Sequence, residues 1–173
     1  MSAIIAACQS GDLDADVQVV VAPKEDIPAV LDARQAGVNV QIVPPTDEGY
    51  GENLLKALEG SDILCLAGYL RLLPNEVLAA FPDRILNVHP ALLPKFGGKG
   101  MYGIRVHEAV LAAGEQESGV TVHLVTEHYD EGRIILQRRC PVLPGDSPES
   151  LAERVLAEEH VAYVEAIRKT IEG

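Results

Sequence analysis

An amide and an imidazole stand two residues apart in the segment 85–90, ILNVHP. Side chains of a β-strand alternate between its two faces, so a strand that ends here directs Asn87 and His89 to the same side. Pro90 cannot extend a central strand ladder, which predicts that the pair lies at the carboxyl end of the strand. Open α/β sheets bind their ligands at that end, so this pair is the first candidate for a functional site.

The chemistry that suits this pair is attack on a carbonyl group. An imidazole is the side chain that most readily carries a proton near neutral pH. An amide N–H is a common donor to an oxyanion that develops in a transition state, and one such donor lowers the barrier by roughly 3 kcal/mol. Spacing alone leaves a second interpretation open, in which Asn87 and His89 are hydrogen-bonded structural side chains.

A carboxylate that could serve His89 occurs much later, in the polar loop 126–132. Asp130 lies there beside Gly132, and the simpler interpretation is an aspartate that shapes a turn. The functional interpretation is a carboxylate that pairs with His89 and raises the pKa of its imidazole. The two residues are distant in sequence, so spacing cannot establish the contact.

The other four histidines show no metal-ligand spacing, and no metal site is predicted. His123 lies on an alternating apolar stretch and is interpreted as a structural or pocket-lining residue. Surface or helix-capping positions are expected for the remaining three, His107, His128 and His160.

The segment 68–74, GYLRLLP, follows a predicted strand and could bind a flat heterocycle. Backbone N–H and C=O groups beside Leu and Tyr side chains suit a pterin ring. The simpler interpretation is a strand-to-helix loop with apolar anchors. A glycine-rich loop at 97–103 is expected to be mobile and could act as a lid, but it matches no phosphate-binding or dinucleotide-binding fingerprint.

Composition limits the class of protein. The chain has 173 residues, of which 47% are hydrophobic and 23% charged, as in a single globular domain. Its formal net charge of −12 argues against nucleic acid as a partner, because phosphate binding needs a basic face. No apolar run approaches the roughly 20 residues that span a bilayer. The three cysteines are far apart and are expected to be reduced, buried side chains of a cytoplasmic protein.

Hydrophobic patterning predicts strands that alternate with helices. The strands are residues 17–21, 38–43, 62–67 and 84–88, and the helices are 2–10, 26–35, 52–58, 74–81, 106–113 and 147 to about 171. Alternation of this kind predicts an α/β fold with a mostly parallel, twisted sheet flanked by helices. Two later strands, 119–125 and 134–137, are expected to form an antiparallel pair that closes one edge.

Three motifs in order along the chain resemble those of folate-dependent formyltransferases: LAGYLRLL at 66–73, NVHPALLP at 87–94, and the loop of Asp130. The similarity covers residues 2 to about 170. The loop 95–103 and the residues EEH at 158–160 favour the phosphoribosylglycinamide formyltransferases, also called glycinamide ribonucleotide transformylases, over the methionyl-tRNA branch.

This resemblance implies a Rossmann-related fold and a reaction of purine biosynthesis, in which the formyl group of 10-formyltetrahydrofolate moves to the amine of glycinamide ribonucleotide. It implies that Asn87 donates to the formyl oxygen and that His89 is the general acid. Asp130 would support His89 and assist proton transfer. The implied folate-binding residues are Leu70, Arg71, Leu72, Leu73 and Asn87, and the implied contact to the ribose of the nucleotide is Glu159.

Other functions remain open beside this one. The alternatives are a formyltetrahydrofolate hydrolase, another folate-dependent formyltransferase, or a folate-binding remnant with weakened catalysis. The expected partners are small-molecule substrates, with no nucleic acid, no membrane and no metal, and the chain is expected to be a monomer or a homodimer.

Two departures from the family pattern carry expectations of their own. Family members begin with a strand and a Gly-x-Gly-Ser-Asn-type loop, which lead into the helix that matches residues 2–10. The resemblance therefore implies one domain, 1–173, that is shorter than the family at its N-terminus, with weakened binding of the substrate phosphate. An arginine that other members bring near the folate has no clear counterpart in residues 44–52.

Overall fold

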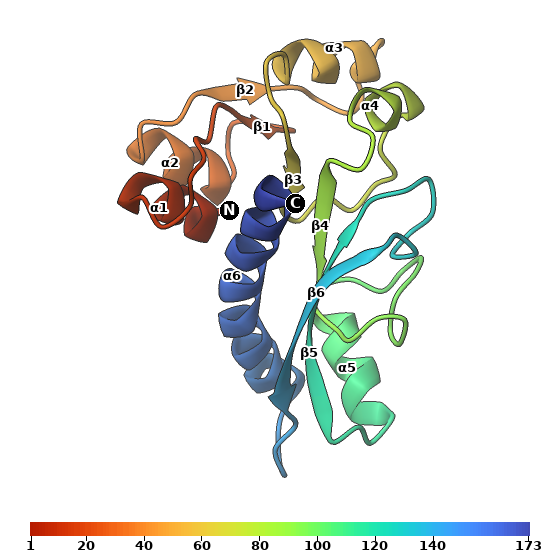
Figure 1. Cartoon of the computed structure of the whole chain (residues 1–173). Helices are drawn as coiled ribbons and strands as arrows, with labels where there is room; N and C mark the ends of the chain where they lie inside the picture. The colour runs from red at the N-terminus through yellow and green to blue at the C-terminus, as the bar shows by residue number, and fades with distance from the viewer.

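The strand that carries the amide and the imidazole, β4 (Ile85–His89), lies inside a four-stranded sheet with the order β3-β4-β5-β6. The other strands are β3 (Leu64–Leu66), β5 (Glu117–Leu124) and β6 (Ile134–Pro141). β3 runs parallel to β4, whereas the pairs β4–β5 and β5–β6 are antiparallel. The computed structural model describes all residues, 1–173 (Figure 1).

A second, two-stranded sheet consists of β1 (Val20–Ala22) and β2 (Val40–Ile42), which are parallel. No strand pairing joins it to the four-stranded sheet. β1 and β3 therefore have one strand neighbour each, and each leaves one backbone edge open. The expectation of a further strand in the family arrangement stays a prediction.

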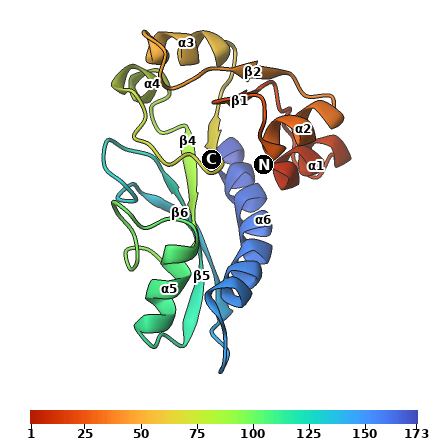
Figure 2. The ribbon, with the colours of Figure 1, turned by 180° about the vertical axis from the view of Figure 1, so that it is seen from behind.

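Six helices surround the two sheets. They are α1 (Ser2–Ser10), α2 (Pro28–Gln35), α3 (Tyr50–Ala57), α4 (Asn75–Ala80), α5 (Ile104–Ala112) and α6 (Pro148–Glu172). The long helix α6 lies along β5 and β6 and also packs against α5 and α1. Seen from behind, α1 and α2 gather beside the C-terminal half of α6, away from α5 (Figure 2).

The larger of two apolar clusters joins α6 to the four-stranded sheet. Among its fully buried members are Leu86, Val120, Val122, Leu151 and Val155. Complete burial of one such side chain contributes roughly 1.5–3 kcal/mol to stability. This cluster fixes β4 and β5 side by side, and so fixes the strand that carries the candidate pair.

Tyr163 of α6 connects the helix to the strand ends. Its hydroxyl lies 2.8 Å from the carbonyl oxygen of Leu66 in β3 and 2.9 Å from that of Leu86 in β4. The side chain is 3% exposed. Because Leu86 directly precedes Asn87, this contact holds the backbone at the start of the candidate site.

The α/β class and the antiparallel edge are confirmed, but the antiparallel part of the sheet is larger than expected. β5 is antiparallel to β4 as well as to β6. β6 continues to Pro141, beyond the apolar run that predicted it, because its polar residues still pair with β5 as far as Glu117. β1 begins three residues later than predicted, and Pro74 is the N-cap of α4 rather than its first residue.

The cysteines are all free, but only Cys140 is buried. Cys8 and Cys65 are half-buried, which corrects the expectation that all three are buried. Burial raises the pKa of the Cys65 thiol to about 12, so it stays protonated. None of the helices has the length and apolar character needed to cross a bilayer.

The open edges and short strands of the two-stranded sheet predict faster local opening there than in β5. Backbone amides of Val20–Ala22 should exchange with solvent at least about tenfold faster than those of Val120–Val122, which lie in a strand paired on both sides. Hydrogen exchange followed by NMR measures both sets. Equal protection would mean that the two-stranded sheet opens only when the whole chain unfolds.

Candidate active site

β4 and β5 align the candidate residues across one antiparallel pair. Asn87 is opposite His123, and His89 is opposite Thr121. The loop between β5 and β6 brings Asp130 back to the same strand ends. The structure thus brings together Asn87, His89 and Asp130, as predicted, and adds His123 to them.

His89 is almost completely buried, with 3% of its surface exposed. Its Nε2 lies 2.8 Å from the carbonyl oxygen of Phe96, and its Nδ1 lies 3.5 Å from Oδ2 of Asp130. A protonated imidazole would find an acceptor on each side. Burial nevertheless lowers the pKa of His89 below its ordinary value, against the opposing effects of Asp130 and the Phe96 carbonyl. Asp130 thus raises this pKa, as the functional interpretation expects, but desolvation is larger and the net shift is downward.

Asp130 adopts a left-handed backbone conformation, with φ of 57°, which turns its carboxylate toward the two imidazoles. Its Oδ2 accepts a hydrogen bond from the backbone N–H of Gly98 at 2.8 Å, and its Oδ1 lies 3.5 Å from Nε2 of His123. Burial alone would raise the pKa of this carboxyl, but the two imidazoles and the Gly98 amide hold it below its ordinary value. Asp130 is thus a charged acceptor near neutral pH.

His123 was interpreted from the sequence as structural or pocket-lining, and its hydrogen bonds give it a more specific place. Its Nδ1 lies 2.8 Å from the carbonyl oxygen of Leu124, so this nitrogen carries the proton in the neutral ring. Nε2 then accepts from Nδ2 of Asn87 at 3.2 Å. Asn87 uses one N–H in this bond and keeps the second for another acceptor. Cross-strand pairing, which no local spacing reveals, is what joins these residues.

The predicted heterocycle slot presents apolar side chains to solvent. Leu70 is 59% exposed and Leu72 is 48% exposed, both high values for leucine. Leu73 is only 6% exposed and packs in the smaller apolar cluster, so only its backbone is free to contact a ligand. Arg71 is exposed. The segment therefore offers an uncovered apolar surface next to the end of β3.

Glu159 lies apart from the other predicted site residues. It is on α6, one turn before Tyr163, and no hydrogen bond or ion pair joins it to Asn87, His89 or Asp130. Burial raises the pKa of its carboxyl, against the opposing effect of the α-amino group of Met1. Its role at a substrate remains a prediction.

His107 corrects the sequence-based expectation of a surface position. It is 4% exposed on α5, and its Nδ1 has no hydrogen-bond partner. Burial and the nearby His89 lower the pKa of its imidazole. His128 and His160 are exposed, as predicted.

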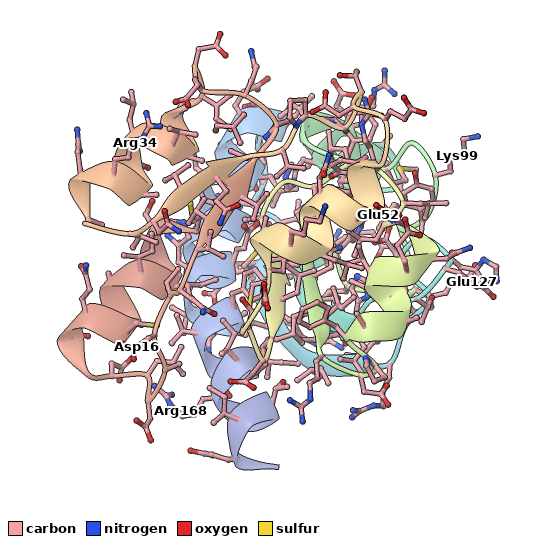
Figure 3. The ribbon with its side chains drawn as sticks, turned by 90° about the horizontal axis from the view of Figure 1, so that it is seen from above. Asp16, Arg34, Glu52, Lys99, Glu127 and Arg168 are labelled. Carbon is pink, nitrogen blue, oxygen red and sulfur yellow. The ribbon has the colours of Figure 1, made fainter.

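The cluster combines three capacities that reaction at a carbonyl requires. Asn87 offers a spare N–H donor, His89 a buried proton carrier, and Asp130 a carboxylate that stabilises the imidazolium. The loops that flank the cluster, which carry Lys99 and Glu127, project on the same side of the molecule (Figure 3). No group of three or more His, Cys, Asp or Glu side chains is arranged to hold a metal ion.

Known proteins share both sequence and fold with this chain. Residues 1–167 match the family model described as formyl transferase. Phosphoribosylglycinamide formyltransferase of Escherichia coli (strain K12) is 35% identical over 169 residues, which cover 94% of this chain and 77% of that protein. A crystal structure of phosphoribosylglycinamide formyltransferase from Brucella melitensis has a TM-score of 0.90 and 40% identity, covering 100% of this chain and 90% of that one.

A plant protein shows a higher identity but is longer. The chloroplastic phosphoribosylglycinamide formyltransferase of Arabidopsis thaliana is 48% identical over 167 residues, which cover 92% of this chain. The chain spans only 57% of the length of that plant protein.

Burial of neutral imidazoles predicts that stability falls as pH falls. The pKa values of His89 and His107 are lower in the folded chain than their ordinary value of 6.5, so the unfolded chain binds more protons below that pH. Between pH 7.5 and 5.5 the free energy of unfolding should decrease, by at most about 1.4 kcal/mol per pH unit for each group. Urea titrations of wild type and His107→Leu measure this, and the variant should show the weaker dependence. If the free energy of unfolding of His107→Leu depended on pH as steeply as that of wild type, the lowered pKa of His107 would be contradicted.

Proposed function

The chain belongs to the formyl transferase family, and from this premise we propose that it transfers the formyl group of 10-formyltetrahydrofolate to the amine of glycinamide ribonucleotide. The observation that carries the proposal is the buried contact at 3.5 Å between Nδ1 of His89 and the Asp130 carboxylate, beside an Asn87 with a spare N–H. Asp130 reaches His89 from a loop 41 positions further along the chain.

Asn87 stabilises the charge that develops as the amine adds to the formyl carbon. The formyl oxygen becomes negative at that point, and the N–H of Asn87 that does not bond His123 donates to it. His123 holds the amide in place through the contact of its Nε2 with Nδ2 of Asn87 at 3.2 Å, while its Nδ1 lies 2.8 Å from the Leu124 carbonyl oxygen. Orientation of the donor is therefore set before substrate binds.

His89 and Asp130 handle the protons of the reaction. A protonated His89 gives its proton to the oxygen that gains charge and takes it back when the tetrahedral intermediate collapses to the formyl product. Asp130 stabilises the imidazolium from 3.5 Å and remains ionised, so it can take a proton from the attacking amine and return it to the departing nitrogen of the folate. His89 thus handles the proton at the formyl oxygen, and Asp130 handles the proton that moves from the amine to the folate nitrogen.

The folate supplies the formyl group, and the exposed leucines suit its heterocycle. Leu70 and Leu72 offer apolar surface that a flat ring would cover, with the backbone of Arg71 and Leu73 between and after them. Glu159 on α6 binds the ribose hydroxyls of the nucleotide in this proposal. The compartment proposed is the cytoplasm, which fits three free cysteines.

Assay of 10-formyltetrahydrofolate consumption with glycinamide ribonucleotide tests the proposal. We expect wild type to turn over, His89→Ala and Asp130→Ala to lose at least about 100-fold in kcat, and Asn87→Ala to lose about 100-fold to 1,000-fold. His128→Ala is the control, because this histidine is exposed and outside the cluster. Full activity in either His89→Ala or Asp130→Ala would eliminate the mechanism.

Two further results would replace the proposed reaction by another. Folate turnover at an equal rate without the amine would indicate a formyltetrahydrofolate hydrolase. Calorimetry that detects folate binding but no nucleotide binding, together with no turnover, would indicate a binding protein.

A further inference from the structure

The loop that follows β4 supplies a partner to both catalytic groups. It runs from His89 to Phe96, whose carbonyl oxygen accepts from Nε2 of His89 at 2.8 Å. Two residues later, the N–H of Gly98 donates to Oδ2 of Asp130 at 2.8 Å. The position of this loop therefore determines the surroundings of the imidazole and of the carboxylate together.

Two side chains of the neighbouring strands hold the middle of this loop. The hydroxyl of Thr121, on β5, donates to the carbonyl oxygen of Ala91 at 2.6 Å and accepts from the N–H of Leu93 at 3.0 Å. Nε2 of Gln137, on β6, donates to the carbonyl oxygen of Leu93 at 2.9 Å and to Oγ1 of Thr121 at 2.9 Å. We name these two residues the Gln137–Thr121 clamp.

Packing supports the clamped segment only in part: Ala91 and Leu93 are buried, but the segment also borders a cavity. A cavity of about 310 Å³ lies there, and Leu92, Pro94, Phe96 and Gln137 line it. Interiors are normally filled to high density, and atoms beside a cavity lack the contacts that resist displacement. The hydrogen bonds from Gln137 and Thr121 therefore restrain the loop in addition to the packing of Ala91 and Leu93.

Displacement of Leu93 would reach the catalytic groups directly. A Cβ at Gly97 would lie 2.5 Å from Cδ2 of Leu93 and 3.2 Å from Cβ of Asp130, so the Gly97 backbone is in close contact with both. Gly97 stands between Phe96 and Gly98, the two residues that bond His89 and Asp130. A shift at Leu93 thus moves both of these hydrogen-bonding groups.

We propose that Gln137 is a positioning residue that, through Leu93 and Thr121, holds the Phe96 carbonyl against His89 and the Gly98 amide against Asp130. The expected effect of Gln137 on turnover rests on the formyl transfer proposed above, but its expected effect on the titration of His89 does not. Gln137 touches none of the charged or titratable groups that face His89, which are Asp130 from the β5–β6 loop, His123 from β5 and His107 from α5.

Loss of the clamp should change the titration of His89 in a known direction. The hydrogen bond to the Phe96 carbonyl favours the protonated imidazole. A loop released from Gln137 weakens that bond, so the pKa of His89 falls further, and the fraction of protein that carries a proton on His89 at neutral pH falls with it. A residue that only stabilised the fold would lower the melting temperature and leave this titration unchanged.

The experiment compares Gln137→Met, which keeps the length of the side chain and removes its donors, with Arg139→Met. Arg139 lies two residues along β6, is exposed, and pairs only with Glu117. NMR titration of the histidines in the substrate-free protein, with the His89 signal identified by its absence in His89→Gln, should show the His89 pKa lower by at least about 0.5 in Gln137→Met. Arg139→Met should match wild type.

Kinetics give the second readout. For Gln137→Met we expect kcat to fall at least about tenfold, with KM for the folate changed less than about twofold, because the residue touches no substrate. Gln137→Leu, which also removes the donors and adds no charge, serves if Gln137→Met does not fold, and it should give the same changes. A wild-type His89 titration in a folded Gln137 variant would overturn the proposal. A wild type without formyl transfer would instead refute the proposed reaction, and the titration would still decide the clamp.

Discussion

A carboxylate and an imidazole held 3.5 Å apart with little access to water constrain everything around them. Removing the Asp130 charge from water is expensive, and burial also disfavours a charge on His89, so both groups need hydrogen-bond partners. Here the Gly98 amide bonds Asp130 and the Phe96 carbonyl bonds His89. The loop after β4 satisfies both groups in this conformation.

The surrounding strands supply the directions in which these groups point. β4 provides Asn87 and His89 on one face, and antiparallel pairing with β5 places His123 opposite Asn87. The proton on Nδ1 of His123, directed to the Leu124 carbonyl, makes the opposite ring nitrogen an acceptor and so orients the amide. The Leu124 carbonyl thereby influences which N–H of Asn87 is left to donate to a developing charge, although the His123 ring lies between the two groups.

Local patterns predicted the strand end well, because alternation and Pro90 depend only on neighbours in sequence. They also identified Asp130, but only the family resemblance joined it to His89, since the contact spans two strands and a loop. His107 was predicted to lie at the surface, and it is buried on α5, because burial of a helical histidine depends on what packs above it. Pairing of His123 with Asn87 depends on strand register, which the sequence does not state.

The charges on β6 have a consequence for the behaviour of the protein in concentrated solution. β6 is an outer strand of the four-stranded sheet, and it carries Arg138 and Arg139. Charged side chains on an edge strand oppose pairing with extended segments of other molecules. Colloidal stability then depends on the repulsion among molecules of net charge −12, which added salt would screen.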